Sequence, residues 1–176
     1  FIDEVGNDLG LKQWPKLKDI DAAHVFCRNP VGNGSAPVIR RQTLDDISFE
    51  IETADGPRTC WFDESFRQSE DIECWTRIAA TTRWKFEGIP DVLTLYRVST
   101  GGLSANVEKQ FESWRRMRDK LQTVAAKLVA EYGRKSEAYQ LRYLARRLTA
   151  NGAGKEAASY AWRAVFMHPA MLREEP

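Results

Sequence analysis

The sequence of 176 residues has few cysteines and few histidines. Its three cysteines are Cys27, Cys60 and Cys74, and no Cys-x-x-Cys pair occurs. Its two histidines are His24 and His168. Scattered thiols in an odd number predict neither a disulfide framework nor a structural zinc site, and they favour a reducing, cytoplasmic setting. Two distant histidines cannot supply the paired imidazoles of a zinc protease, so that class of enzyme is excluded.

No charge of one sign dominates, and no long hydrophobic run is present. The 26 Lys and Arg residues against 25 Asp and Glu residues give a formal net charge of +1, which argues against a nucleic-acid binder. No apolar run approaches the ~20 residues that span a bilayer, and no signal-peptide core opens the chain. We expect one globular domain with an appendage, in the cytoplasm or at the inner face of the membrane. Because the first residue is Phe1, we expect a piece of a longer protein.

Charge divides the chain into two parts. Residues 1–107 carry 12 basic and 17 acidic residues, a net −5, whereas residues 108–176 carry 14 and 8, a net +6. Most prolines and glycines lie before residue 103. The sequence therefore predicts an α/β part over 1–107 and a helical extension over 108–176. The basic helices are expected to be solvated, with contact to anionic lipid head groups as the alternative.

The first part contains signals for short strands and helices. Residues 36–40 and the β-branched, apolar stretch within 89–98 predict strands, the second of them buried. Thr43 is expected to cap a brief helical turn. Ser69 is expected to cap a helix over residues 70–80, whose apolar residues recur at helical spacing.

The second part predicts three helices. The first is expected to end at Gly133, the second at Asn151-Gly152, and the third, over 155–168, at Pro169. The spacing of Ala157, Ala164 and Pro169 matches half of a tetratricopeptide repeat. A non-catalytic helical interaction module is therefore one hypothesis for the function.

An acidic and aromatic stretch over residues 61–77 carries the most chemistry. Glu70 and Asp71 fall in the first turn of the expected helix, where the helix dipole favours ionised carboxylates. Trp75 follows Asp71 by one turn, on the same face. A carboxylate beside an aromatic ring suits a carbohydrate, because the ring covers the apolar face of a sugar while the acid accepts a hydroxyl proton. The alternative is that the two acids only complement the dipole.

Four blocks occur in an order that resembles a known enzyme family. They are Gly32-Asn33-Gly34-Ser35 with Arg40-Arg41, Phe62-Asp63-Glu64, Ser69-Glu70-Asp71 with Trp75 and Arg77, and Leu93-Thr94-Leu95-Tyr96-Arg97-Val98 with Leu103-Ser104. Together they resemble the acceptor-side half of family 2 glycosyltransferases with the GT-A fold, over residues 25–107. The resemblance implies a partial GT-A mixed sheet, followed here by the helical appendage. It implies an inverting transfer of one sugar from a nucleotide-sugar to a saccharide or lipid-linked saccharide, in bacterial cell-surface polysaccharide synthesis.

The resemblance also implies roles for single residues. Asp71 is the expected catalytic base, and Glu70 is expected to shape the acceptor pocket. The other residues singled out, each with a structural alternative, are Trp75, Gly34 and Ser35 on the acceptor side and Arg40, Arg97 and Ser99 on the donor-diphosphate side. For Arg97 the alternative is an anchor to a nearby carboxylate, and for Trp75 it is plain core.

The donor-binding half of the family is not recognisable in this sequence. Asp19-Ile20-Asp21 spells the family's Asp-x-Asp metal motif, but it follows a Pro-Lys-Leu-Lys stretch and no apolar strand. Ser99 stands where many relatives carry a metal-supporting His. We therefore expect the divalent cation, Mg²⁺ or Mn²⁺, to be held in the full-length enzyme by ligands mostly outside this chain. On this interpretation the chain alone is inactive.

Overall fold

The computed structural model describes residues 1–98 and 106–174. Within them the protein is mixed α/β, with 51% helix and one two-stranded antiparallel sheet. The elements in chain order are α1 (Ala22–Arg28), α2 (Arg41–Asp46), β1 (Phe49–Thr53), β2 (Gly56–Cys60), α3 (Glu70–Thr81), α4 (Val107–Val124), α5 (Ala126–Ala150), α6 (Gly154–Met167) and α7 (Met171–Glu174).

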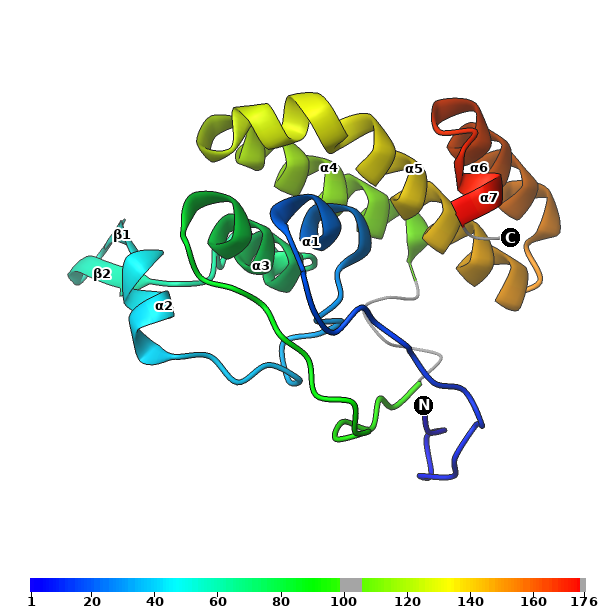
Figure 1. Ribbon diagram of the computed structural model, residues 1–176, viewed down its shortest axis with the longest axis horizontal. Helices are drawn as coiled ribbons and strands as arrows, with labels where there is room; N and C mark the ends of the chain where they lie inside the picture. Colours follow the sequence, from blue (N-terminus) through cyan, green and yellow to red (C-terminus); the bar gives the residue numbers. More distant parts are fainter. Residues whose placement is uncertain (99–105, 175–176) are drawn as a thin grey trace.

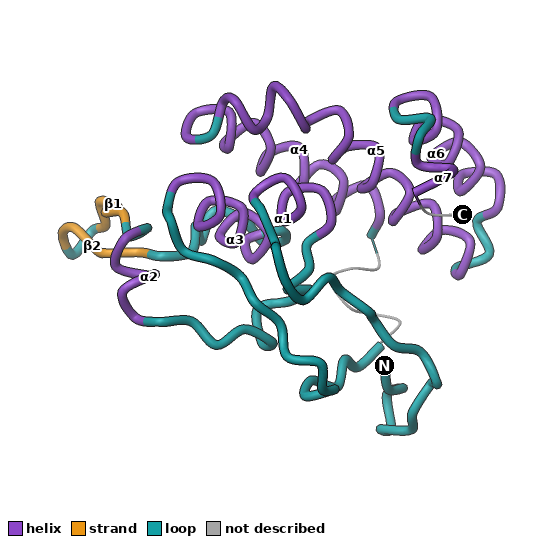
Figure 2. The backbone as a smooth tube through the Cα atoms, viewed as in Figure 1, coloured by secondary structure: helices purple, strands orange, loops and turns teal. Residues whose placement is uncertain are grey.

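Most of the helices lie together in a layer, and the loop segments of the first part of the chain run below it in the view of Figure 1. Helices α4 and α5 lie over α1 and α3, while α6 and α7 pack near one end of α5 and the β1–β2 hairpin projects at the opposite end of the molecule. Beneath α1 and α3, the N-terminal segment and the chain after α3 run as loops (Figure 2). Backbone hydrogen bonds join these two segments, from Gly88 N to Leu17 O at 2.7 Å and from Ile2 N to Tyr96 O at 2.9 Å.

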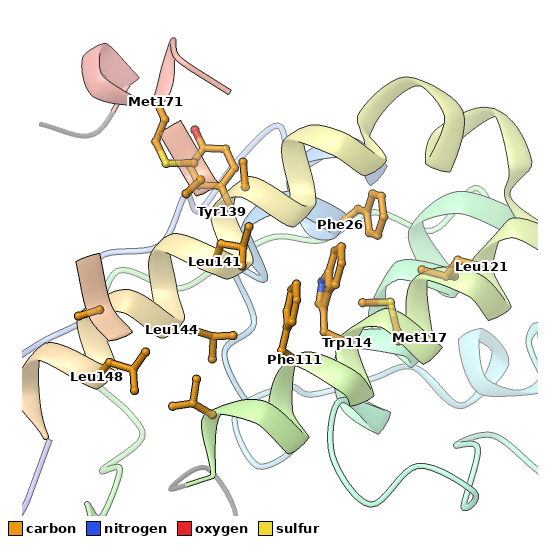
Figure 3. Packing of buried hydrophobic residues seen from close by; sticks show 14 of the residues in the cluster. Phe26, Phe111, Trp114, Met117, Leu121, Tyr139, Leu141, Leu144, Leu148 and Met171 are labelled. Atoms are coloured by element: carbon orange, nitrogen blue, oxygen red, sulfur yellow. The ribbon is translucent and has the colours of Figure 1, made fainter. Parts of the chain in front are cut away.

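The larger hydrophobic cluster lies among α1, α4, α5 and α6 (Figure 3). Trp114 of α4 is 2% exposed, and Leu141 and Leu144 of α5 are fully buried. Burying each such side chain contributes about 1.5–3 kcal/mol. Phe26 of α1 enters the same cluster, and its carbonyl oxygen accepts a hydrogen bond from Ser136 Oγ at 2.7 Å. The long helix α5 is thereby tied to the first part of the chain.

A second, smaller cluster lies on another face of α3. Cys74, Trp75 and Ile78 of α3 pack there with Val25 and Ile47. Every residue from Glu73 to Ile78 is buried. Because α3 is enclosed in this way, its side chains are placed by packing as well as by local helix geometry.

Most of the expected helix ends are confirmed, and one is wrong. Helix α3 begins after Ser69, although this residue adopts the left-handed region (φ 66°) and its side chain forms no capping hydrogen bond. Helix α5 ends at Asn151-Gly152, and α6 ends before Pro169. Gly133 does not end a helix: it lies buried inside α5, and the break falls at Ala125. A glycine inside a helix costs only about 1 kcal/mol, which the packing of the buried face of α5 offsets.

The expected strands are not formed within the described residues. Residues 36–40 are irregular, with Val38 fully exposed, and Val92, Leu93 and Leu95 are between 62% and 73% exposed. The sheet lies instead at β1 and β2, in a register that pairs Phe49 with Cys60. This hairpin was not predicted, although the alternating Phe-Glu-Ile-Glu-Thr run is a strand signal; the two turn residues are Ala54 and Asp55.

The small helix α2 also differs from its prediction. Thr43 lies inside α2 and is buried, whereas Arg40 occupies the N-cap position. The three cysteines are free. In the described ranges, no helix combines the length and the apolar character that a bilayer crossing requires.

Candidate functional site

The candidate base Asp71 stands in the first turn of α3. Its side chain is half-buried, and its Oδ1 accepts the backbone N–H of Ile72 at 2.7 Å. Burial raises the pKa of Asp71 above its ordinary value, and the neighbouring charge of Glu70 raises it further. No cationic side chain forms an ion pair with Asp71 in the part of the chain that the structure describes. A carboxylate with a raised pKa binds a proton more strongly, which suits a general base.

The neighbouring carboxylate, Glu73, has a different environment. Its side chain is fully buried. Oε1 of Glu73 lies 2.9 Å from Arg77 Nε and 3.0 Å from Lys120 Nζ, which comes from α4. Two cations therefore hold one buried carboxylate, as burial of a charge requires. We call Glu73, Arg77 and Lys120 the buried ion network.

The buried ion network fixes the loops around α3. Arg77 donates to Ile47 O at 2.5 Å and to Trp61 O at 2.6 Å. Lys120 Nζ also contacts Asp63 Oδ2 at 2.9 Å. Burial would raise the pKa of Asp63, but hydrogen bonds from Lys120 and Ser65 outweigh it and lower the pKa to about 2. The loop between β2 and α3 is thus held ionically to both α3 and α4.

Trp75 is a core residue. Its ring is 1% exposed and meets Phe62 edge-on, with the ring centroids 5.7 Å apart. Val31 and Ile39, which flank the Gly-Asn-Gly-Ser stretch, pack against the same cluster. A ring enclosed in this way cannot cover a sugar, so the expectation that Trp75 is an acceptor platform is wrong. The side chain instead supports the loop before α2.

Gly34 and Ser35 lie in that loop, open to solvent. The Asn33 side-chain oxygen accepts the backbone N–H of Ser35 at 2.8 Å and that of Ala36 at 3.0 Å. A Cβ atom at Gly34 would meet nothing within 4 Å. The loop therefore has room for a ligand close to its backbone, while the described residues show no hydrogen bond from it to Glu70 or Asp71.

The residues expected on the donor side are not gathered into one cluster. Arg40 is exposed at the start of α2. Arg97 donates to the backbone oxygens of Asp3 at 3.0 Å and Glu4 at 2.8 Å. These two hydrogen bonds tie Arg97 to the N-terminal segment, and its anchoring to a carboxylate stays a prediction. Ser99 lies outside the described residues.

The described residues do not fit a divalent-cation site. Residues 1–98 and 106–174 contain no group of three or more His, Cys, Asp or Glu side chains that could hold a metal. Asp21 of the Asp-Ile-Asp stretch accepts the backbone N–H of His24 at 2.7 Å and caps α1. Its carboxylate thus has a structural partner.

Sequence reasoning missed the buried ion network. The spacing of Glu73 and Arg77, four residues apart, is a signal for a helical ion pair. Lys120 has no such local signal, because it comes from a different helix, and only the packing of α4 against α3 brings it to Glu73.

Comparisons with known proteins add no family assignment. The chain matches no protein-family model, no curated protein and no solved structure. The chemistry of the site is therefore argued from its own residues. Within the described residues Asp71 is a half-buried carboxylate without an ionic partner, on a helix held by the buried ion network. A carboxylate in such a setting can accept a proton.

Proposed function

We propose that this chain is the acceptor-side part of an inverting family 2 glycosyltransferase with a GT-A fold, in which Asp71 is the catalytic base. The single observation that carries the proposal is the contrast between two carboxylates on α3. Glu73 is fully buried and paired with two cations, whereas Asp71 is half-buried, has no ionic partner among the described residues and has a raised pKa. On this proposal Glu73 has a structural role, and Asp71 is available for proton transfer.

The proposed reaction is a single displacement. Asp71 accepts the proton of an acceptor hydroxyl, and that oxygen forms a bond to the anomeric carbon of a nucleotide-sugar. The bond from the anomeric carbon to the diphosphate oxygen breaks, and the nucleoside diphosphate leaves from the opposite face. The configuration at the anomeric carbon is inverted. A positioned base of this kind contributes about 10²–10⁴ in rate.

The extended chain below α3 supports a further part of the proposal. Val92, Leu93 and Leu95 are each more than 60% exposed, and in a strand over this segment neighbouring side chains would alternate between its two sides. Apolar residues on both sides are typical of a strand that is covered on both faces. We assign this segment to a contact with the donor-binding half of the enzyme. The ligands of the expected divalent cation are proposed to lie mostly in that half.

The proposed acceptor is a saccharide or a lipid-linked saccharide, as in the synthesis of bacterial cell-surface polysaccharides. The open loop at Gly34 and Ser35 and the carboxylate of Glu70 are assigned to acceptor contacts, and the exposed Arg40 to the diphosphate. Trp75 is assigned to support of the loop before α2. This arrangement corresponds to a cytoplasmic enzyme that adds one sugar at a time.

Substitution of Asp71 in the enzyme that contains this segment together with its donor-binding half tests the proposal. Asp71→Asn keeps the oxygen that accepts the Ile72 N–H but cannot take a proton at neutral pH. We expect kcat for sugar transfer to fall about 10²–10⁴-fold, with KM for the nucleotide-sugar unchanged. Transfer is measured with a radiolabelled nucleotide-sugar.

Glu64→Gln is the matched control, because Glu64 is an exposed carboxylate in the same acidic stretch, over residues 61–77, and pairs with Arg58 at 2.6 Å. We expect it to leave kcat unchanged. Circular dichroism and thermal unfolding check that both variants are folded. Undiminished transfer by Asp71→Asn would remove Asp71 from the mechanism and, with it, the observation that carries the proposal.

The second candidate function is a non-catalytic helical interaction module. It is favoured by Ala157 and Ala164 of α6, which are 6% and 1% exposed in the cluster that α6 shares with α5. Small residues at these positions allow the close approach of paired helices that a tetratricopeptide unit needs. On this interpretation a partner protein would bind the helical extension, and its binding would be unaffected by Asp71→Asn.

A further inference from the structure

A pocket lies between α1 and α5, outside the candidate functional site. Its volume is about 280 Å³, at the lower end of the range for small-molecule sites. The lining comes from the segment before α1, from α1 and from α5. The residues that give it its chemical character are Lys16, Asp21, His24, Arg28, Lys135 and Tyr139.

The lining carries more positive than negative charge. Lys16, Arg28 and Lys135 are cationic, and Asp21 is the one acidic residue among the lining residues that the structure describes. The carboxylate of Asp21 is already used as the cap of α1. Lys16 Nζ donates to the backbone oxygen of Asp19 at 2.6 Å, and within residues 1–98 and 106–174 no carboxylate contacts it. The pocket therefore favours an anion.

Tyr139 places two of the three cations. The Arg28 guanidinium carbon lies 4.5 Å from the centroid of the Tyr139 ring, and Lys135 Nζ lies 5.9 Å from it. The ring is 8% exposed and belongs to the large hydrophobic cluster (Figure 3). Cation–π contact with this buried ring stabilises both charges beside the pocket.

One anionic group is already bound beside the pocket. Glu174 of α7 contacts Lys135 Nζ at 3.1 Å, accepts a hydrogen bond from the Tyr139 hydroxyl and lies 3.2 Å from His168 Nε2. These hydrogen bonds, that from Tyr139 foremost, lower the pKa of Glu174 to about 2. The end of the pocket thus has the donors that an oxyanion needs.

We propose that this pocket binds a small phosphate-bearing ligand, either phosphate itself or a phosphate monoester, through Lys16, Arg28 and Lys135, and that Glu174 competes for Lys135. Guanidinium and ammonium groups are the side chains that bind phosphate oxygens. The volume admits a phosphate with a small organic group. This site is independent of the proposed sugar transfer.

Titration of the ¹⁵N-labelled 176-residue protein tests the proposal. Inorganic phosphate and glycerol phosphate are added at constant ionic strength, with acetate in a separate arm. We expect saturable shifts of amides in α1 and α5. Burial, Lys16 and Arg28 lower the pKa of His24, so a bound dianion is expected to raise it, which histidine ring signals report. Tighter binding of glycerol phosphate assigns the pocket to monoesters, and equal binding assigns it to phosphate.

Substitution of single charged residues tests whether each of them strengthens or weakens phosphate binding. Lys16→Gln and Lys135→Gln are expected to weaken phosphate binding about tenfold each, since each removes a charge-assisted hydrogen bond. Glu174→Gln is expected to strengthen it, because the competing charge is lost. Lys127→Gln, an exposed position on α5 outside the pocket, is the matched control and should change nothing.

Three results would overturn the proposal: shifts that do not saturate, equal weakening by Lys127→Gln and Lys16→Gln, or acetate binding as tight as phosphate binding. The first two indicate a diffuse charge effect, and the third a carboxylate site. Lys16 lies in a loop, so its variant is informative even where Lys135→Gln fails to fold. Sugar transfer is not measured, and the outcome is therefore separate from that of the proposed function.

Discussion

The carboxylates of α3 show how position within one helix turn separates structural from chemical roles. Asp71 and Glu73 are two residues apart, so their side chains point to different sides of the helix. Glu73 points to α4 and meets Lys120, whereas Asp71 is half-buried and keeps a raised pKa. Folding raises the pKa of Asp71, so the folded state holds the proton more strongly than the unfolded state. The stability of the fold therefore falls as the pH rises from the unfolded pKa to the folded pKa. We infer that ionised Asp71 is retained at a cost in stability.

Substitution of the buried carboxylate tests its structural role. Glu73→Gln leaves Arg77 and Lys120 without their shared counter-charge in a site where Glu73 is fully buried. We expect the free energy of unfolding to fall by about 3–5 kcal/mol. The matched control is Glu64→Gln, which removes an exposed pair with Arg58 and is expected to cost about 0–1 kcal/mol. Urea unfolding at pH 7 measures both, and equal losses would contradict a special role for the buried ion network.

At the scale of elements, α6 combines a buried and an exposed apolar face. Ala157 and Ala164 pack inward, whereas Trp162 and Phe166 are 74% and 81% exposed. Trp162 and Phe166 are four residues apart and share one face, and Lys155, two turns before Trp162, lies on the same side. Together with the net +6 of residues 108–176, this stripe suits the surface of an anionic membrane.

The double variant Trp162→Ser with Phe166→Ser tests contact of α6 with a membrane. We expect sedimentation with phosphatidylglycerol vesicles to weaken about tenfold or more, because the two apolar side chains that would enter the interface are lost. Trp14→Ser, which removes an indole that is 81% exposed on the N-terminal segment, is the control and should have no effect. Binding that is equal on phosphatidylcholine vesicles, or unchanged in the double variant, would argue against this use of α6.

At the scale of the whole molecule, ion pairs join segments that are far apart in the sequence. Asp63 and Lys120 link the loop before α3 to α4, and Lys135 and Glu174 link α5 to α7. The large hydrophobic cluster adds Phe26 and Phe66 from the first part of the chain to the helices of the second. The Asp63–Lys120 pair and this apolar packing therefore both hold the first part to the second, whereas the Lys135–Glu174 pair acts within the second part.

The pH dependence of stability follows from two carboxyl groups whose pKa values are lowered in the folded protein. The pKa values of Asp63 and Glu174 are about 2 in the folded protein, below the ordinary values of 3.8 and 4.5. Their contribution is present above the unfolded values and is lost as the pH falls from about 4.5 to about 2. We expect the urea midpoint to fall over this range. The loss should be smaller in Asp63→Asn, and an equal loss in that variant would assign the acid sensitivity to other groups.

The sequence by itself determined the helical second part, the start of α3 after Ser69 and the ends of α5 and α6. These depend on local signals, because helix periodicity and helix-stopping residues act within a few positions of each other. The alternation of the Phe-Glu-Ile-Glu-Thr strand, which was not predicted, is a local signal of the same kind.

Only the tertiary structure decided which side chains meet. Nothing local shows that Trp75 is enclosed, that Lys120 reaches Glu73, or that Arg97 binds the carbonyls of Asp3 and Glu4. Gly133 continues α5 because packing outweighs a glycine's weak helix preference. Burial and ionic partners depend on segments that are distant in the chain, and their free energies exceed local preferences. For that reason the candidate base could be proposed from the sequence, whereas its supporting contacts could not.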